Sequence, residues 1–335
     1  MGEGRGAGAS GPRRIEWRLD VRDAPGLPGA HEIAASLVAP AGFGESGPAT
    51  LLFCLPGGSL SRRYWDLEVD GDRRFSFAEF MAARGFATLA IDHLGIGDSS
   101  RPADGAAPDL RGFARANQAA LAQALERLRS GDSDAGLPPP AELRSIGVGH
   151  SMGSCLTVVQ QAEHAPHRAL VLLSFTTRGL PHFLSDEERA LAGDPQRARA
   201  RLPELIDARF GTPFPSPPRG AGREAAYGVG SAPPEAVRAL RDASTDLLAG
   251  PGILSMIPGA FAPEALRIRV PVFLAVGDHD LHAADHASGE FPHAPEVLAY
   301  TLPDCWHCHN VANTRERLWA RIARWIPAAT ASITE

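Results

Sequence analysis

The chain of 335 residues contains no lysine, so arginine fills all of its 33 Lys and Arg positions. This absence excludes chemistry that needs a lysine amine, such as a Schiff base with pyridoxal phosphate, the phosphate-binding lysine of a P-loop, or a Ser–Lys dyad. The formal net charge is −6. A surface with this balance has no basic patch for nucleic acid or for an anionic membrane, so we expect neither partner.

Cysteine is scarce, and four residues in a chain of this length cannot form a disulfide scaffold. We expect them to be reduced and buried. No apolar run reaches the roughly 18 residues that a membrane-spanning helix needs. Residues 1–14 are rich in Gly and Arg and lack the apolar core of a signal peptide, so we expect a disordered tail and a cytoplasmic protein.

Short apolar runs alternate with amphipathic segments along the rest of the chain. Two strands are expected within residues 15–40, and further strands at residues 51–55, 87–91, 146–148, 169–175, 270–276 and 297–302. Helices are expected after the capping box that begins at Ser76, over residues 110–128 and 154–163, and after Asn313. This alternation predicts an α/β fold with a doubly wound, mostly parallel sheet.

Residues 176–266 interrupt the alternation and are too many for a crossover loop. They contain helix-like segments at residues 186–192, 195–209 and 234–248. We expect this insertion to form a separate unit that divides the α/β core into residues 15–175 and 267–335.

Residues 149–153 read G-x-S-x-G, with Ser151 at the centre, and stand between an apolar run and an apolar helix. A strand that turns sharply into a helix holds its turn residue in a strained conformation, and small neighbours are needed to avoid collisions. The turn presents the serine hydroxyl above the sheet, at the N-terminus of the helix. This context indicates a nucleophile elbow, whereas a G-x-S-x-G sequence alone also occurs by chance.

An acid and a base follow in the order Ser, Asp, His. Asp280 ends a Gly-x-x-Asp turn after the run 270–276, and His307 follows the strand 297–302. The imidazole accepts the serine proton, and the carboxylate orients and stabilises the imidazolium. Asp278 is the alternative acid, and His309, two residues beyond His307, is the alternative base.

The chain resembles the α/β-hydrolase superfamily over nearly its whole length after the first dozen residues. Besides the elbow, the resemblance rests on the apolar run 51–55, on residues 56–58, on the Asp-x-x-Gly-x-Gly-x-Ser sequence at 92–99, and on the acid and base turns. It implies that the insertion after the sixth strand caps the active site. Pro56 departs from the pattern, because family members usually have histidine there, which affects the expected shape of the oxyanion loop.

The oxyanion donors expected for this chemistry are the backbone N–H groups of Met152 and Gly58, with Ser59 as the alternative to Gly58. Residues near the loop, at the elbow or in the insertion are candidates for contact with substrate: Ser59, Tyr64, Trp65, His150, Met256 and Phe261. For the apolar residues of the insertion, packing within the insertion itself is the alternative. An apolar lining with few charges favours a small to medium uncharged substrate.

Two other clusters could suggest a cofactor or metal. Residues 305–309 match the C-x-x-C-H signature of haem attachment, but they coincide with the turn that carries His307. His279, His282, Asp285 and His286 lack the spacing of a metallohydrolase site, and no second Cys/His pair completes a zinc site. We therefore expect no cofactor and no metal.

Together these features predict a serine hydrolase that cleaves a carboxylic ester, lactone or thioester through an acyl-enzyme. Acyl transfer to another alcohol would use the same residues and remains an alternative. A non-catalytic binding protein with a hydrolase fold is the alternative from a different class. The partner is a small molecule in each case, and the sequence does not indicate an oligomeric state.

Overall fold

The computed structural model describes residues 11–45, 47–103, 106–132, 135–217, 226–283, 285 and 287–331. Its strands form one eight-stranded sheet in the order β1-β2-β4-β3-β5-β6-β7-β8. β1 pairs with β2 and β2 with β4 in antiparallel fashion, and every other neighbouring pair is parallel. The strands are β1 (Arg13–Asp20), β2 (Glu32–Ala39), β3 (Pro48–Leu55), β4 (Phe86–Ile91), β5 (Glu142–His150), β6 (Leu170–Leu173), β7 (Val272–Gly277) and β8 (Val297–Leu302).

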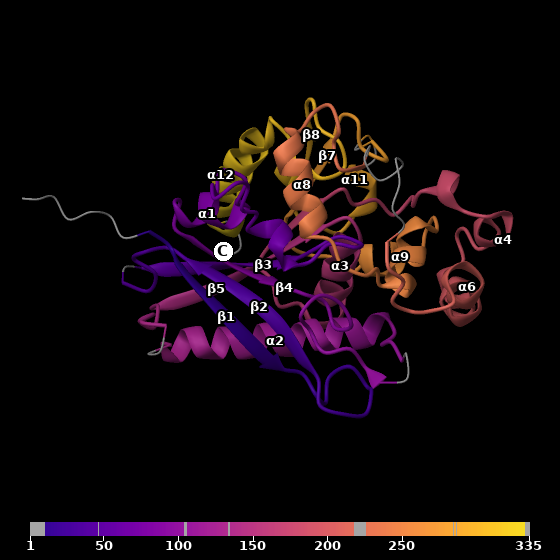
Figure 1. Cartoon of the computed structure of the whole chain (residues 1–335), viewed down its shortest axis with the longest axis horizontal. Helices are drawn as coiled ribbons and strands as arrows, with labels where there is room; N and C mark the ends of the chain where they lie inside the picture. The colour runs from indigo at the N-terminus through magenta and orange to yellow at the C-terminus, as the bar shows by residue number, and fades with distance from the viewer. Residues whose placement is uncertain are drawn as a thin grey trace, which may run out of the picture.

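Helices cover both faces of the sheet (Figure 1). On one face pack α2 (Leu110–Ser130) and α3 (Met152–His164), and on the other α1 (Phe77–Ala82) and α12 (Arg315–Ala331). Side chains along β3 alternate between the two layers, so Phe53 joins the layer of α2 and α3 while Leu52 joins the layer of α1 and α12. The predicted doubly wound α/β fold is confirmed.

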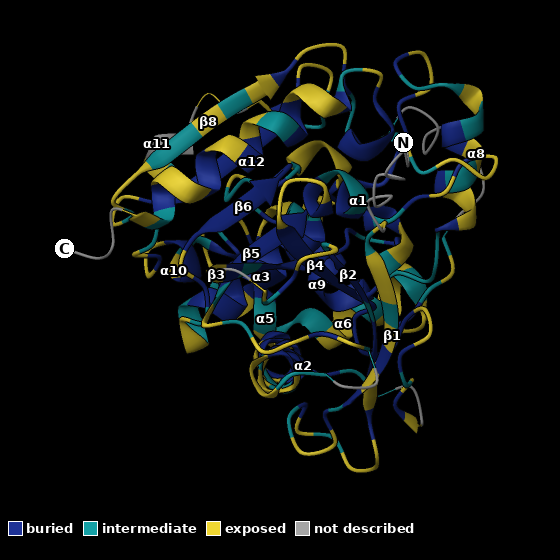
Figure 2. Ribbon diagram, turned by 90° about the vertical axis from the view of Figure 1, so that its left-hand side faces the viewer, coloured by how far each residue is buried: buried dark blue, intermediate teal, exposed yellow. Residues whose placement is uncertain are grey.

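The inner strands of the sheet are more deeply buried than its edge strands. Every residue of β4, β6 and β7 is buried, whereas the edge strands β1 and β8 carry exposed residues along their length (Figure 2). Parallel strands buried on both faces read as continuous apolar runs, which is why the sequence located them. Among the described helices, none is both long enough and apolar enough to cross a bilayer.

The segment between β6 and β7 is helical, as expected. It contains η3 (Pro181–Phe183), α4 (Asp186–Arg189), α5 (Pro195–Ala200), α6 (Leu202–Phe210), α8 (Pro234–Asp242), α9 (Ala249–Met256) and α10 (Ala262–Ala265). The last two pack against α3, and α6 packs on α9 at the right-hand end of the view in Figure 1. Among the described residues, short elements elsewhere in the chain are η1 (Arg62–Trp65), α11 (Ala287–Glu290) and η4 (His309–Val311).

Several boundaries differ from the sequence-based expectation. The helix expected over 195–209 is divided at Arg201, and the helix expected over 234–248 ends at Asp242. α9 was not predicted because Gly250, Pro251 and Gly252 have low helix propensity; it forms where these residues are buried. β1 begins at Arg13, two residues inside the expected tail, because it pairs with β2. Residues 1–10 lie outside the described residues.

Four buried histidines in this fold have a lowered pKa. Burial alone lowers the pKa of His167 to about 3, and burial is the main cause that lowers it to about 4 for His93 and His309. Burial, followed by the positive charges of its histidine neighbours, holds the pKa of His150 well below its usual range. In the unfolded chain these groups titrate near 6.5, so at mildly acidic pH the unfolded state binds more protons than the folded state.

We therefore expect the free energy of unfolding to fall as pH falls through about 6.5. The slope is at most about 1.4 kcal/mol per pH unit for each histidine. Urea unfolding between pH 7.5 and 5.5 measures it. His167 is hydrogen-bonded to Ser145, and no described hydrogen bond joins it to Ser151, Asp280 or His307. Replacing His167 with Asn should reduce the slope by the contribution of one histidine. An unchanged slope in H167N would contradict this assignment.

Candidate active site

Ser151 occupies the turn between β5 and α3 in a left-handed conformation, with φ 52° and ψ −123°. A non-glycine residue rarely adopts this conformation, and it persists only where the surroundings hold it. The glycines on either side are required by space. A Cβ atom on Gly149 would lie 2.4 Å from the Cα of Ser154, and one on Gly153 would lie 2.3 Å from the carbonyl oxygen of Leu55. The geometry matches a nucleophile elbow.

Three side chains from separate segments meet at this turn. The hydroxyl of Ser151 lies 2.8 Å from Nε2 of His307, and Nδ1 of His307 lies 2.6 Å from Oδ1 of Asp280. Ser151 follows β5, Asp280 follows β7 and His307 follows β8, so parallel strands deliver all three to the carboxyl edge of the sheet. The arrangement permits His307 to accept the serine proton while Asp280 holds the ring in the required tautomer.

The carboxylate of Asp280 has no solvent exposure. It also accepts hydrogen bonds from the N–H groups of Gly277, at 3.2 Å, and Leu281, at 2.7 Å, and from the hydroxyl of Ser174. Burial opposes ionisation, but attraction to His307 and the hydrogen bond from it outweigh burial and hold the pKa of Asp280 well below its usual range. Sequence reasoning missed Ser174, which directly follows β6 and carries no motif.

Asp278, the alternative acid, binds the backbone of the turn before His307 and makes no described hydrogen bond to the imidazole. Its carboxylate accepts hydrogen bonds from the N–H groups of Asp304 and Cys305, both at 2.9 Å. These bonds secure the turn that leads from β8 to His307. Asp304 has a φ of 51°, so the turn needs such support.

His309, the alternative base, is fully buried and faces the acid rather than the nucleophile. Its Nε2 atom lies 3.8 Å from Oδ2 of Asp280. His150 is buried as well, and its Nε2–H donates to the carbonyl oxygen of His307 at 2.8 Å. Its ring packs against Tyr64, with centroids 4.7 Å apart. His150 therefore lies behind the base and supports its backbone, which differs from the expected contact with substrate.

The oxyanion loop, residues 56–59, lies directly beside the first turn of α3. A Cβ atom on Gly153 would be 2.4 Å from the carbonyl oxygen of Pro56, so the two backbones are in contact. The N–H of Met152 is in the first turn of α3, where N–H groups have no intrahelical partner. Within the described part of the chain, the N–H of Gly58 has no protein acceptor. Both groups are thus available to an oxyanion.

Pro56, the departure from the family pattern, is held through its carbonyl group. The Nε2–H of His93 donates to this oxygen at 3.0 Å, and His93 is fully buried after β4. Ser59 is also buried, with a φ of 60°. The loop therefore combines a rigid proline, two glycines and a strained serine.

Most residues expected to contact substrate pack in the interior. Tyr64 and Trp65 have no exposed surface. The hydroxyl and the carbonyl oxygen of Tyr64 accept hydrogen bonds from the backbone N–H and the side-chain amide of Asn310. Phe261 is 2% exposed and belongs to the core that α3 shares with the insertion, while Met256 is half-buried at its edge. Sequence reasoning missed Leu247, whose Cδ1 atom would lie 2.9 Å from a Cβ atom on Gly58.

The cysteine and histidine clusters make no metal centre among the residues described. Cys305 and Cys308 are buried, and burial raises the pKa of the Cys305 thiol. His279 stacks on Trp306, and His282 is partly buried at a turn, where its Nδ1 atom lies 3.3 Å from the carbonyl oxygen of Ala283. His286 lies outside the described residues.

The chain belongs to the alpha/beta hydrolase family, whose model matches residues 52–321. No curated protein sequence matches it. A hypothetical protein from Pseudomonas aeruginosa has a similar structure, with a TM-score of 0.59 and 18% identity over 96% of this chain and 94% of that one.

Two further structures are similar. The enol-lactonase from Burkholderia xenovorans has a TM-score of 0.55 and 17% identity, over 89% of this chain and 97% of that one. The thioesterase domain from the curacin biosynthetic pathway has a TM-score of 0.56 and 16% identity, over 94% of this chain and 99% of that one. At these identities the likeness concerns the fold.

The two aspartates give a direct test of the site. Asp280→Asn should lower kcat by about 10⁴-fold, because the amide disfavours the tautomer of His307 that accepts the serine proton. Asp278→Asn should cost far less, because one amide oxygen still accepts a bond from the turn. Steady-state kinetics on a p-nitrophenyl ester, with melting temperatures as the control for folding, measure both. The reverse ranking would refute the assignment.

Proposed function

We propose that this protein is a serine hydrolase that cleaves a carboxylic ester, lactone or thioester of a small to medium uncharged substrate. The observation that supports this most directly is the continuous hydrogen-bonded chain from Ser151 through His307 to the buried Asp280. The strained turn at Ser151 and the adjacent N–H groups of Met152 and Gly58 supply the remaining requirements of acyl transfer.

In the proposed reaction the Ser151 oxygen attacks the carbonyl carbon while Nε2 of His307 accepts its proton. The N–H groups of Met152 and Gly58 stabilise the negative charge on the carbonyl oxygen, and loss of one such donor typically costs about 3–4 kcal/mol. His307 then donates its proton to the leaving alcohol or thiol. Water, deprotonated by the same imidazole, attacks the acyl-enzyme and releases the acid.

Acyl transfer to another alcohol would use the same residues and differs in excluding water from the acyl-enzyme. The enol-lactonase and the thioesterase domain among the similar structures act on a lactone and a thioester, as their names state. Both bond types therefore belong in an activity screen beside simple esters. The helices inserted between β6 and β7 are proposed to act as a cap, with Leu247 and Met256 closest to the acyl group.

Covalent labelling separates an enzyme from a non-catalytic binding protein. A fluorophosphonate probe should attach to Ser151, with the modified peptide identified by mass spectrometry. Ser151→Ala should abolish labelling and hydrolysis, because no other group in the proposed mechanism supplies the nucleophile. Ser130→Ala, an exposed serine at the end of α2, is the matched control and should label fully. A wild-type protein that does not label would overturn the proposed function.

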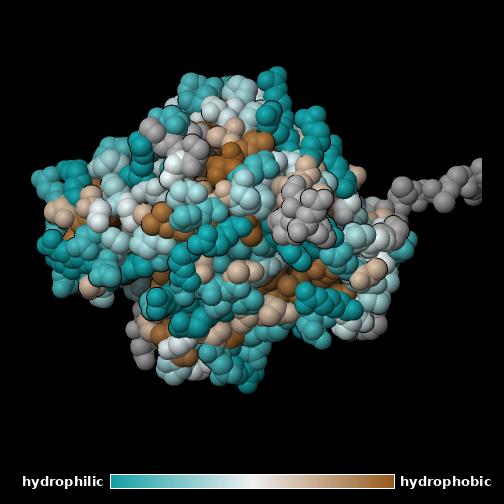
Figure 3. Space-filling view, turned by 180° about the vertical axis from the view of Figure 1, so that it is seen from behind, coloured by the Kyte–Doolittle hydropathy of each residue, from teal (hydrophilic) through white to brown (hydrophobic). Residues whose placement is uncertain are grey.

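Acyl-chain length tests the proposed substrate class. Hydrolysis of p-nitrophenyl esters should be fastest for short to medium chains and weak for palmitate, because long-chain lipids require an exposed apolar surface. The face seen in Figure 3 is mainly hydrophilic, with small separate hydrophobic areas. Leu247→Ala should shift the preference to longer chains, since it removes a side chain above Gly58.

Leu266→Ala is the matched control for this shift. Leu266 lies in the same insertion but is half exposed, and it is not among the side chains nearest to Gly58. Its replacement should leave the chain-length profile unchanged. Equal profiles for wild type and L247A would show that Leu247 does not limit the acyl pocket.

A further inference from the structure

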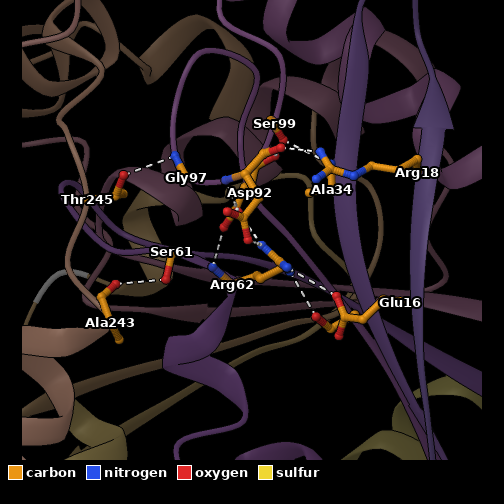
Figure 4. A network of polar contacts seen from close by, with 12 residues as sticks. Glu16, Arg18, Ala34, Ser61, Arg62, Asp92, Gly97, Ser99, Ala243 and Thr245 are labelled. Carbon is orange, nitrogen blue, oxygen red and sulfur yellow. Dashed lines mark hydrogen bonds and ion pairs between the residues drawn. The ribbon is translucent and has the colours of Figure 1, made fainter.

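Residues 243–247, which we call the clamp segment, connect α8 to α9 within the insertion and lie on the oxyanion loop. The carbonyl oxygen of Ala243 accepts a hydrogen bond from the hydroxyl of Ser61 at 2.8 Å (Figure 4). It accepts a second one from the N–H of Ser61 at 2.9 Å. The N–H of Thr245 donates to the carbonyl oxygen of Ser59 at 3.0 Å. Leu60 and Ser244 form an antiparallel bridge between these bonds. The two segments thus pair through one isolated antiparallel bridge and the hydrogen bonds that flank it.

The clamp segment is also joined to the loop that follows β4. The N–H of Gly97 donates to Oγ1 of Thr245 at 3.0 Å (Figure 4). Asp246 forms an ion pair with Arg101 and accepts a hydrogen bond from Ser216. The hydroxyl of Thr245 and the carboxylate of Asp246 therefore both tie the clamp segment to this second loop of the core.

That second loop holds the far end of the oxyanion loop. Asp92 is buried and accepts hydrogen bonds from the N–H of Arg62, at 2.6 Å, and from the N–H of Asp98, at 2.8 Å. The guanidinium of Arg62 pairs with Asp92, Asp98 and Glu16 (Figure 4). A Cβ atom on Gly97 would lie 2.3 Å from Oδ2 of Asp92, so the loop closes tightly around this carboxylate.

The oxyanion loop needs these attachments. Ser59 holds a left-handed φ of 60°, a conformation that persists only where neighbours enforce it. Pro56 has no N–H, so the start of the loop cannot be secured by a bond from its own backbone nitrogen. Gly57 and Gly58 add freedom rather than constraint. The clamp segment and Arg62 together hold the loop after these glycines.

We propose that Thr245 and Ser61 are positioning residues for the oxyanion hole, and that the inserted segment is thereby a structural part of that hole. This inference rests on the proposed function. Through Ser59, the clamp segment fixes the direction of the Gly58 N–H relative to that of Met152. Movement of the clamp segment away from the core would therefore disorder the hole as well as uncover the pocket.

The test is a pair of substitutions that remove the hydroxyl bonds of Thr245 and Ser61 with little change in volume. Thr245→Val alone, and Thr245→Val with Ser61→Ala, should lower kcat by about 10-fold and about 100-fold, approaching the loss seen when one oxyanion donor is removed. KM should change less than threefold. Thr245→Ser, which retains the hydroxyl, should keep wild-type kcat, and Thr330→Val, on α12, is the matched control.

Two readouts distinguish positioning from general damage. Affinity for a trifluoromethyl ketone, which mimics the tetrahedral oxyanion, should fall in parallel with kcat/KM. The pH profile of kcat/KM should stay unchanged, because neither substitution contacts His307 or Asp280. A shifted pH profile, or a kcat within twofold of wild type in the double variant, would overturn the proposal.

Hydrogen–deuterium exchange tests the loop independently of catalysis. Amides in the peptide that covers residues 57–61 should exchange faster in both variants than in wild type, while those of α12 should not change. If wild type labels with the fluorophosphonate but exchange and kcat stay unchanged, the clamp is refuted and the proposed function stands. If wild type does not label, the proposed function fails, and unchanged exchange then refutes the clamp as well.

Discussion

The buried negative charge of Asp280 is the constraint around which the carboxyl edge of the sheet is organised. A carboxylate without solvent exposure is stable only when its lone pairs are satisfied. Here the donors come from three neighbouring strands: Ser174 after β6, Gly277 and Leu281 at the end of β7, and His307 after β8. If any strand shifted in register, the charge would lose a partner. The same bonds therefore maintain both the strand ends and the orientation of the imidazole.

The sequence predicted those features that depend on local pattern. Continuous apolar runs located the buried parallel strands, and G-x-S-x-G identified the turn at Ser151, because the steric demands of that turn act within five residues. The acid and base were placed by the order Ser, Asp, His along the chain and by the resemblance of their turns to those of the α/β-hydrolase superfamily. In the structure the parallel strands β7 and β8 bring Asp280 and His307 to the same edge, although no contact between them is visible in the sequence.

Contacts between distant segments were beyond this reasoning. Ser174 has no motif, and Leu247 and Thr245 reach the oxyanion loop from nearly 190 residues away in the chain, so no periodicity points to them. Tyr64 and Trp65 follow the loop closely in sequence, yet their side chains turn into the core. Helix α9 forms against residue propensity, since packing on α3 stabilises a segment with two glycines and a proline.

Pro56, which departs from the family pattern, begins a loop that is stabilised by contacts from several other segments. A residue without an N–H stands at the start of the oxyanion loop, and the described contacts stabilise the loop by other means. His93 bonds to the Pro56 carbonyl, Asp92 binds Arg62, and the clamp segment pairs with residues 59–61. Two of these three supports come from the loop after β4 and one from the insertion. Because the clamp segment of the insertion pairs with residues 59–61, the segment proposed to select the substrate contacts the loop proposed to stabilise its transition state. Under these two proposals selectivity and rate are linked, since Leu247 belongs to the same clamp segment that is proposed to orient Gly58.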